Sequence, residues 1–206
     1  MVKSGAEGHA GRWATFDCYG TLIDWNAGLL AALGTKSLLR RYHEVEPQVQ
    51  RETPGMSYRQ VMGETARRIG APDPSDTLPE WQPFPEVPEA LERARANGWK
   101  LVILSNTDRD YIEASMGRIG FPFEFAIVAS EIGSYKPAPG HWNAFEQKVG
   151  RLPDVHVAAS LFHDIAPSNE LGLKSVWVNR EGEEPGPRPT REMSDLSRLP
   201  GVLDEL

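Results

Sequence analysis

The sequence has very little cysteine and no long apolar run. Only one of its 206 residues, Cys18, is a cysteine, which excludes an internal disulfide and a cysteine-rich zinc site. No stretch approaches the roughly 20 apolar residues that a membrane-spanning helix needs. The first twelve residues also lack an apolar segment, so we expect a leader ahead of the first strand and not a signal peptide. These absences predict a cytoplasmic protein that does not enter a membrane.

Positive charge is also scarce. The chain has 22 Lys and Arg against 29 Asp and Glu, a net charge of −7, which argues against non-specific nucleic-acid binding. One segment differs, because seven basic and four acidic residues lie between Lys36 and Arg68. This excess indicates either a solvated helical face or a basic lid over an anionic substrate.

Several familiar catalytic motifs are missing. The sequence contains no G-x-S-x-G elbow, no phosphate-binding P-loop, no dinucleotide-type G-x-G-x-x-G and no H-E-x-x-H. His43, His141, His156 and His163 do not have the spacing of metal ligands and are interpreted as surface or hydrogen-bonded residues. Serine hydrolases of the elbow type, nucleotide triphosphatases, dinucleotide-dependent enzymes and zinc peptidases are therefore not indicated.

Strands and helices alternate along most of the chain, which predicts an α/β fold with a Rossmann-like parallel sheet covered on both faces. A helix-rich region at 26–68, broken at Pro47 and at 53–55, follows the first strand. A proline-dense linker at 72–88 comes next, and 181–190 is expected to be an exposed loop. The predicted strands are 12–16, 99–104, 124–129, 155–160 and 174–178, and the predicted helices are 86–97, 108–118, 138–149, 164–171 and 199–206.

Polar residues follow the predicted strands, and ligands in open parallel sheets bind at the carboxyl ends of the strands. Four motifs lie there: Phe16-Asp17-Cys18-Tyr19-Gly20-Thr21, Leu104-Ser105-Asn106, Ser134-Tyr135-Lys136-Pro137, and Ser160 to Asp164 running on to Gly172 and Arg180. Together they resemble the four motifs of the haloacid dehalogenase superfamily, and the first, Asp-x-Tyr-Gly-Thr, is most similar to that of the type II 2-haloacid dehalogenases.

The resemblance implies a core domain, formed by residues 12–24 and 86–206, and a small helical cap domain, formed by residues 25–85. It also implies an aspartate nucleophile, Asp17, held by Thr21. Lys136 is expected to keep Asp17 ionised, and Asp164 to orient Lys136 or position the hydrolytic water. The residues expected to contact a substrate are Tyr19, Ser105, Asn106, Arg40 and Arg41.

Two positions depart from the phosphatases of this superfamily. Tyr19 stands where they usually carry a second aspartate as the acid, and a tyrosine with a pKa near 10 is a poor proton donor at neutral pH. Ala159 falls near the position of a magnesium-binding aspartate. We therefore expect neither a metal site nor a cofactor, with Mg²⁺ as the alternative for a phosphatase.

The leading functional hypothesis is hydrolysis of the carbon–halogen bond of a small 2-haloacid through an ester on Asp17. A phosphatase with an aspartyl-phosphate intermediate and a non-catalytic binding protein of the same fold remain as alternatives. The expected partner is a small anionic substrate, with no nucleic acid and no membrane, and the prediction allows a homodimer.

Overall fold

The computed structural model describes residues 11–206, and six strands in that range form one parallel sheet. Residues 1–10, which belong to the expected leader, lie outside the described residues. The spatial order of the strands is β3-β2-β1-β4-β5-β6, so the expected α/β fold with a Rossmann-like parallel sheet is confirmed. The strands are β1 (Arg12–Phe16), β2 (Trp99–Ser105), β3 (Phe125–Val128), β4 (Val155–Ala158), β5 (Lys174–Val178) and β6 (Arg191–Met193).

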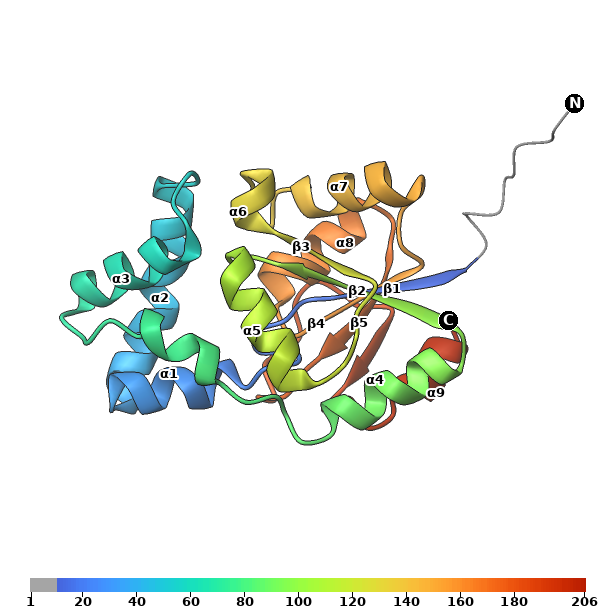
Figure 1. Ribbon diagram of the computed structural model, residues 1–206, viewed down its shortest axis with the longest axis horizontal. Coiled ribbons are helices and arrows are strands. Elements are labelled where there is room, and N and C mark those ends of the chain that lie inside the picture. Colours follow the sequence, from blue (N-terminus) through green and yellow to red (C-terminus); the bar gives the residue numbers. More distant parts are fainter. Residues whose placement is uncertain (1–10) are drawn as a thin grey trace, which may run out of the picture.

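Helices cover both faces of this sheet (Figure 1). On β2, Leu101 and Ile103 join the larger apolar core, whereas Val102 and Leu104 join a second core on the opposite face. This alternation is the two-residue period of a strand buried on both sides. The larger core includes residues of α4 (Val87–Ala96), α5 (Arg109–Ile119) and α9 (Leu199–Asp204), and the second includes residues of α7 (Gly140–Val149). Two short helices, α6 (Ala129–Ile132) and α8 (Ala166–Glu170), complete the layer that contains α7 in Figure 1.

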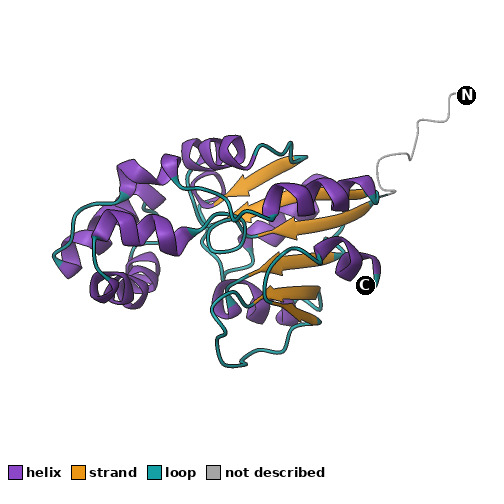
Figure 2. Ribbon diagram, turned by 90° about the horizontal axis from the view of Figure 1, so that it is seen from below, coloured by secondary structure: helices purple, strands orange, loops and turns teal. Residues whose placement is uncertain are grey.

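A separate helical layer lies beyond the carboxyl ends of the strands, toward which the arrowheads point (Figure 2). It contains α1 (Trp25–Leu33), α2 (Lys36–Glu52), α3 (Tyr58–Ile69) and the 3₁₀-helix η1 (Ser75–Glu80). Asp24, Thr35 and Ser57 cap α1, α2 and α3 with side-chain oxygens that accept backbone N–H groups. Among residues 11–206, no helix is long and apolar enough to cross a membrane.

Two sequence-based expectations about local structure were wrong, and one strand was missed. Pro47 lies inside α2 and does not end it, because burial of Tyr42 and Val49 outweighs the roughly 3 kcal/mol that an interior proline costs. The 72–88 segment contains η1 and is not only a linker. The strand β6 was missed because its three residues are mostly exposed and carry no apolar pattern. The division into a core domain and a cap domain at the stated residues stays a prediction.

Candidate active site

Asp17 follows β1 directly and is fixed through both its backbone and its carboxylate. Its backbone N–H donates to Val157 O at 3.0 Å, which extends the pairing of β1 with β4. The Thr21 hydroxyl donates to Asp17 Oδ2 at 2.9 Å and accepts from the backbone N–H of Ala159, also at 2.9 Å. Gly20 takes a positive φ of 87° in the turn between them. The turn therefore aims one carboxylate into the space beyond the sheet.

Lys136 contacts the other oxygen of this carboxylate. The Lys136 Nζ donates to Asp17 Oδ1 at 2.9 Å, to Asp164 Oδ1 at 2.6 Å and to Leu104 O at 2.8 Å. These contacts use all three protons of the ammonium group. Burial alone would lower the pKa of Lys136, but attraction to Asp164 and Asp17 raises it above its ordinary value. The lysine is therefore a fixed cation between two carboxylates.

Asp164, in the π-helical turn η2 (Leu161–Ile165) that precedes α8, is almost fully buried. Burial would raise the pKa of its carboxyl group, but Lys136 and a hydrogen bond from His156 hold that pKa well below its ordinary range. Asp164 Oδ1 accepts from Lys136 Nζ and lies 2.9 Å from His156 Nε2. The structure thus brings together Asp17, Thr21, Lys136 and Asp164, the four residues expected to be catalytic.

The side chains of Ser105 and Asn106, at the end of β2, differ in their hydrogen bonds. The Asn106 amide binds the backbone of Lys136, with Oδ1 accepting from Lys136 N at 2.6 Å and Nδ2 donating to Lys136 O at 3.0 Å. The Asn106 side chain therefore holds the backbone at Lys136. Asn106 also lines the cavity, and its contact with a substrate stays a prediction. The buried Ser105 hydroxyl has no hydrogen-bond partner within the described chain, although Ser105 lines the pocket. A substrate oxygen can supply the missing partner.

Tyr19 lines the same pocket but directs its hydroxyl to Ser115 on α5, at 3.0 Å. Its ring stacks on Tyr58 of the helical layer, with 6.3 Å between the ring centroids. Burial raises the pKa of the Tyr19 hydroxyl well above its ordinary value. The residue beside the nucleophile is consequently a poor acid at neutral pH.

These residues form the floor of a cavity of about 390 Å³ between the sheet and the helical layer. That volume suits a small ligand. The start of α1 and one face of α2 form the opposite wall, and η2 and the loop after β5 close the sides. The polar and aromatic residues of these walls include Asp24, Trp25, Asn26, His43, Glu46, Gln50, Phe162, His163, Asn179 and Arg180.

Arg40 and Arg41 are exposed on α2 and are not part of the cavity wall. Both were predicted to contact the substrate. The residues of α2 that line the cavity are instead His43, Glu46, Pro47 and Gln50. Helical phase accounts for Arg41, which lies on the opposite side of α2 from the 43-46-47-50 face. Arg40 lies at the edge of that face, but one turn nearer the start of the helix, where it is exposed.

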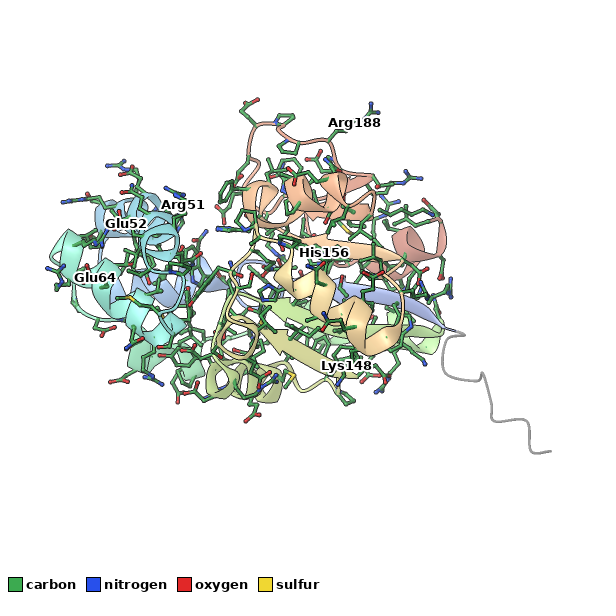
Figure 3. The ribbon with its side chains drawn as sticks, turned by 90° about the horizontal axis from the view of Figure 1, so that it is seen from above. Arg51, Glu52, Glu64, Lys148, His156 and Arg188 are labelled. Carbon is green, nitrogen blue, oxygen red and sulfur yellow. The ribbon has the colours of Figure 1, made fainter. Side chains whose placement is uncertain are left out.

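Much of the basic excess between residues 36 and 68 belongs to surface ion pairs. Arg59 pairs with Asp76 and Asp110, and Arg68 pairs with Glu52 and Glu64. Arg51, at the end of α2, lies nearer the layer of the parallel sheet than Glu52 and Glu64 do (Figure 3). Burial lowers the pKa of His163, and the positive charge of Arg51 adds to that lowering. The solvated-face interpretation thus accounts for these paired arginines. Arg51 is exposed and, like Arg40 and Arg41, is not part of the cavity wall, but its charge acts on His163 of that wall.

The sequence reasoning missed Glu46, which lines the cavity and is only 5% exposed. Its Oε1 accepts from Gln50 Nε2 at 2.6 Å. Burial raises the pKa of its carboxyl group to about 7, despite hydrogen bonds from Tyr58 and Gln50 that lower it. One sequence feature could have indicated it. Glu46 and Gln50 follow Tyr42 at intervals of four residues, so these polar side chains share the buried face of α2.

Comparison with known proteins agrees with this fold and identifies the family. The sequence pattern of the haloacid dehalogenase-like hydrolases matches residues 12–159. The (S)-2-haloacid dehalogenase H-109 of Pseudomonas putida is 26% identical, over 89% of this chain and 94% of that protein. The structure of a dehalogenase with an intermediate complex superimposes with a TM-score of 0.83 at 19% identity, covering 93% of this chain and 96% of that one. The L-2-haloacid dehalogenase of Xanthobacter autotrophicus, with chloropropionic acid covalently bound, gives a TM-score of 0.80 at 16% identity, with coverages of 95% and 99%.

The chain therefore belongs to the haloacid dehalogenase-like hydrolases. The family match includes β1 with Asp17, the end of β2 and Lys136, and it ends at Ala159, five residues before Asp164. The two structural similarities, both below 25% identity, support the fold.

Glu46 provides a test of the cavity wall. A carboxyl group with a raised folded pKa favours the native state when protonated, so its contribution falls as pH rises from 4.5 to about 7. This gap between the unfolded and folded pKa values corresponds to about 3 kcal/mol in the free energy of unfolding. Relative to the wild type, Glu46→Gln should become more stable by up to that amount between pH 5 and pH 8, in urea unfolding. Glu44→Gln, on the exposed side of α2, should show a nearly constant difference. A constant difference for Glu46→Gln as well would contradict the placement of Glu46.

Proposed function

We propose that this chain hydrolyses the carbon–halogen bond of a small 2-haloacid, with Asp17 as the nucleophile. The observation that carries the proposal is the Asp17 carboxylate, bound at one oxygen by Lys136 and at the other by Thr21, at the floor of a small cavity. Relatives that match nearly the whole chain are named (S)-2-haloacid dehalogenases, which supports this substrate class.

In the first half-reaction, a carboxylate oxygen of Asp17 attacks the carbon that bears the halogen. A carbon–oxygen bond forms, the carbon–halogen bond breaks, and the halide leaves with the bonding electron pair. A departing halide needs no proton, so the poor acidity of the buried Tyr19 does not hinder this step. Lys136 Nζ, which donates to Asp17 Oδ1 at 2.9 Å, holds the carboxylate in position for the attack.

In the second half-reaction, a water oxygen attacks the carboxyl carbon of the Asp17 ester. One water proton passes to Asp164, and the bond between that carbon and the ester oxygen breaks. The departing alkoxide takes the proton from Asp164 and becomes the hydroxyl group of a 2-hydroxyacid. The second water proton goes to solvent, which restores the Asp17 carboxylate. Lys136, which contacts both carboxylates, stabilises the negative charge that develops on the ester.

The Ser105 hydroxyl, which has no hydrogen-bond partner within residues 11–206, can donate to the substrate carboxylate. We assign the halide to the cap side, near Arg51. The proposal includes no cofactor, because Tyr19 and Ala159 occupy the positions where a phosphatase of this family would carry carboxylates. Cytoplasmic localisation and a homodimer stay predictions.

Halide release is the direct test. Purified protein should release chloride or bromide from 2-chloropropionate, 2-bromopropionate or haloacetates, measured by ion chromatography, with an equal amount of hydroxyacid. Excess chelator should leave most of the rate, and Asp17→Asn should release nothing above background because it lacks the nucleophile. Phosphate esters with and without magnesium complete the screen. No halide from chloro-, bromo- or fluoroacids would exclude the proposal, and a magnesium-restored release of phosphate would support the phosphatase alternative.

The position of the leaving group predicts different roles for two arginines of α2. Because the charge of the halide develops in the transition state, Arg51→Ala should lower kcat by about tenfold or more with a smaller change in KM. Both arginines are exposed and outside the cavity wall, but the charge of Arg51 acts on His163 of that wall. Arg41→Ala removes an equal charge from an earlier position on α2, so both constants should stay near the wild-type values. Steady-state kinetics on 2-chloropropionate measure both. Equal effects of the two substitutions would remove Arg51 from the mechanism.

A further inference from the structure

A histidine lies beneath the site and belongs to no part of the reaction described above. His156, on β4, is fully buried (0% exposed) in the interior of the core (Figure 3). Its Nε2 lies 2.9 Å from Asp164 Oδ1, and its Nδ1 lies 2.9 Å from the Thr15 hydroxyl on β1. The Trp142 ring packs edge-on against it, with 5.4 Å between the ring centroids. The imidazole therefore has one fixed position and two polar contacts.

The chemistry of the neighbours determines one proton on this ring. The pKa of Asp164 is held well below its ordinary range, so Asp164 is ionised and can only accept hydrogen bonds. The nitrogen that faces it, Nε2, must therefore carry a proton and donate it. On the other side, Thr15 Oγ1 lies 2.9 Å from Nδ1 and 3.3 Å from Val155 O, so its hydroxyl can serve Nδ1 as donor or acceptor.

These contacts divide the Asp164 carboxylate into two unlike oxygens. Oδ1 accepts from both Lys136 and His156, whereas Oδ2 has no hydrogen-bond partner within residues 11–206. Because Asp164 is part of the cavity wall, Oδ2 is the oxygen left for a water molecule. Lys136 alone, with contacts to three oxygens, fixes the position of Oδ1 but not the rotation of the carboxylate plane.

We propose that His156 is a positioning residue for hydrolysis of the covalent intermediate: its Nε2–H, held from behind by Thr15, sets the Asp164 carboxylate so that Oδ2 receives the proton of the attacking water. The inference rests on the proposed function. It assigns His156 to the second half-reaction, because formation of the ester by Asp17 does not require Asp164 to accept a proton.

Two neutral amides provide a matched pair of variants. In His156→Gln the side-chain amide can reach the Nε2 position and still donate to Asp164. In His156→Asn the shorter amide reaches only the Nδ1 position and keeps the Thr15 contact alone. Both remove the ring from the same buried site, so their unfolding free energies, measured in urea, show how far a stability difference contributes.

The measurement is intact-protein mass spectrometry during turnover of 2-chloropropionate, together with rapid-quench rates of both half-reactions. Ester formation should stay near the wild-type rate in both variants. Ester hydrolysis should stay within about threefold of wild type in His156→Gln but fall by about tenfold or more in His156→Asn, as expected when a general base is misplaced. The adduct on Asp17 should then accumulate, and both kcat and KM should fall in His156→Asn.

Two results would overturn the inference. One is equal hydrolysis rates in His156→Gln and His156→Asn. The other is parallel slowing of both half-reactions in either variant, which indicates loss of structure and not misplacement of Asp164.

A second measurement needs no substrate, so it separates this inference from the proposed function. Nitrogen-15 NMR of the histidine rings should show His156 Nε2 protonated from pH 6 to pH 8, with the Asn variant identifying the signal. Absence of turnover in the wild type would refute the proposed function. An unprotonated Nε2 would refute the positioning role, whatever the substrate.

Discussion

The site depends on one buried cation, the ammonium group of Lys136. Its side chain is 1% exposed and lies between Asp17 and Asp164, whose side chains are 12% and 1% exposed. Removing one partner of a buried ion pair typically costs about 3–5 kcal/mol, because it leaves charge without compensation. Here two carboxylates would lose their shared partner. The ammonium group that holds the Asp17 carboxylate therefore also links the ends of three strands.

The parallel sheet is what makes this contact attainable. Asp17 follows β1, Leu104 O comes from β2, and Asp164 follows β4, although Lys136 is 119 residues from Asp17 in the sequence. Since Phe16 pairs with both Ile103 and Val157, these strand ends lie side by side. The alternation of strands and helices was enough to predict this convergence. Each member of the site either follows an apolar strand or lies in a short loop beyond one.

The residues of α2 that line the cavity could not be predicted as well as the residues at the strand ends. Arg40 and Arg41 were chosen by charge, but helical phase and position along the helix together set which side chains face the cavity, and neither is known until the helix is packed. Glu46 escaped notice because a carboxyl group on a charged helix resembles a surface residue. His156 was equally hidden, since its partners Thr15 and Asp164 come from a neighbouring strand and a later turn. Contacts between side chains of different elements carry no signature in a single sequence.

The central claim is that Asp17 forms a covalent ester with the substrate. The isotopic composition of the Asp17 carboxylate oxygens tests this claim directly. One turnover of excess enzyme on 2-chloropropionate in heavy-oxygen water should place the label in the Asp17 carboxylate, read by peptide mass spectrometry. The first 2-hydroxyacid released should carry an unlabelled hydroxyl group, because its oxygen comes from Asp17. Label in that first product, with none in Asp17, would mean that water attacks the substrate itself and would contradict the account.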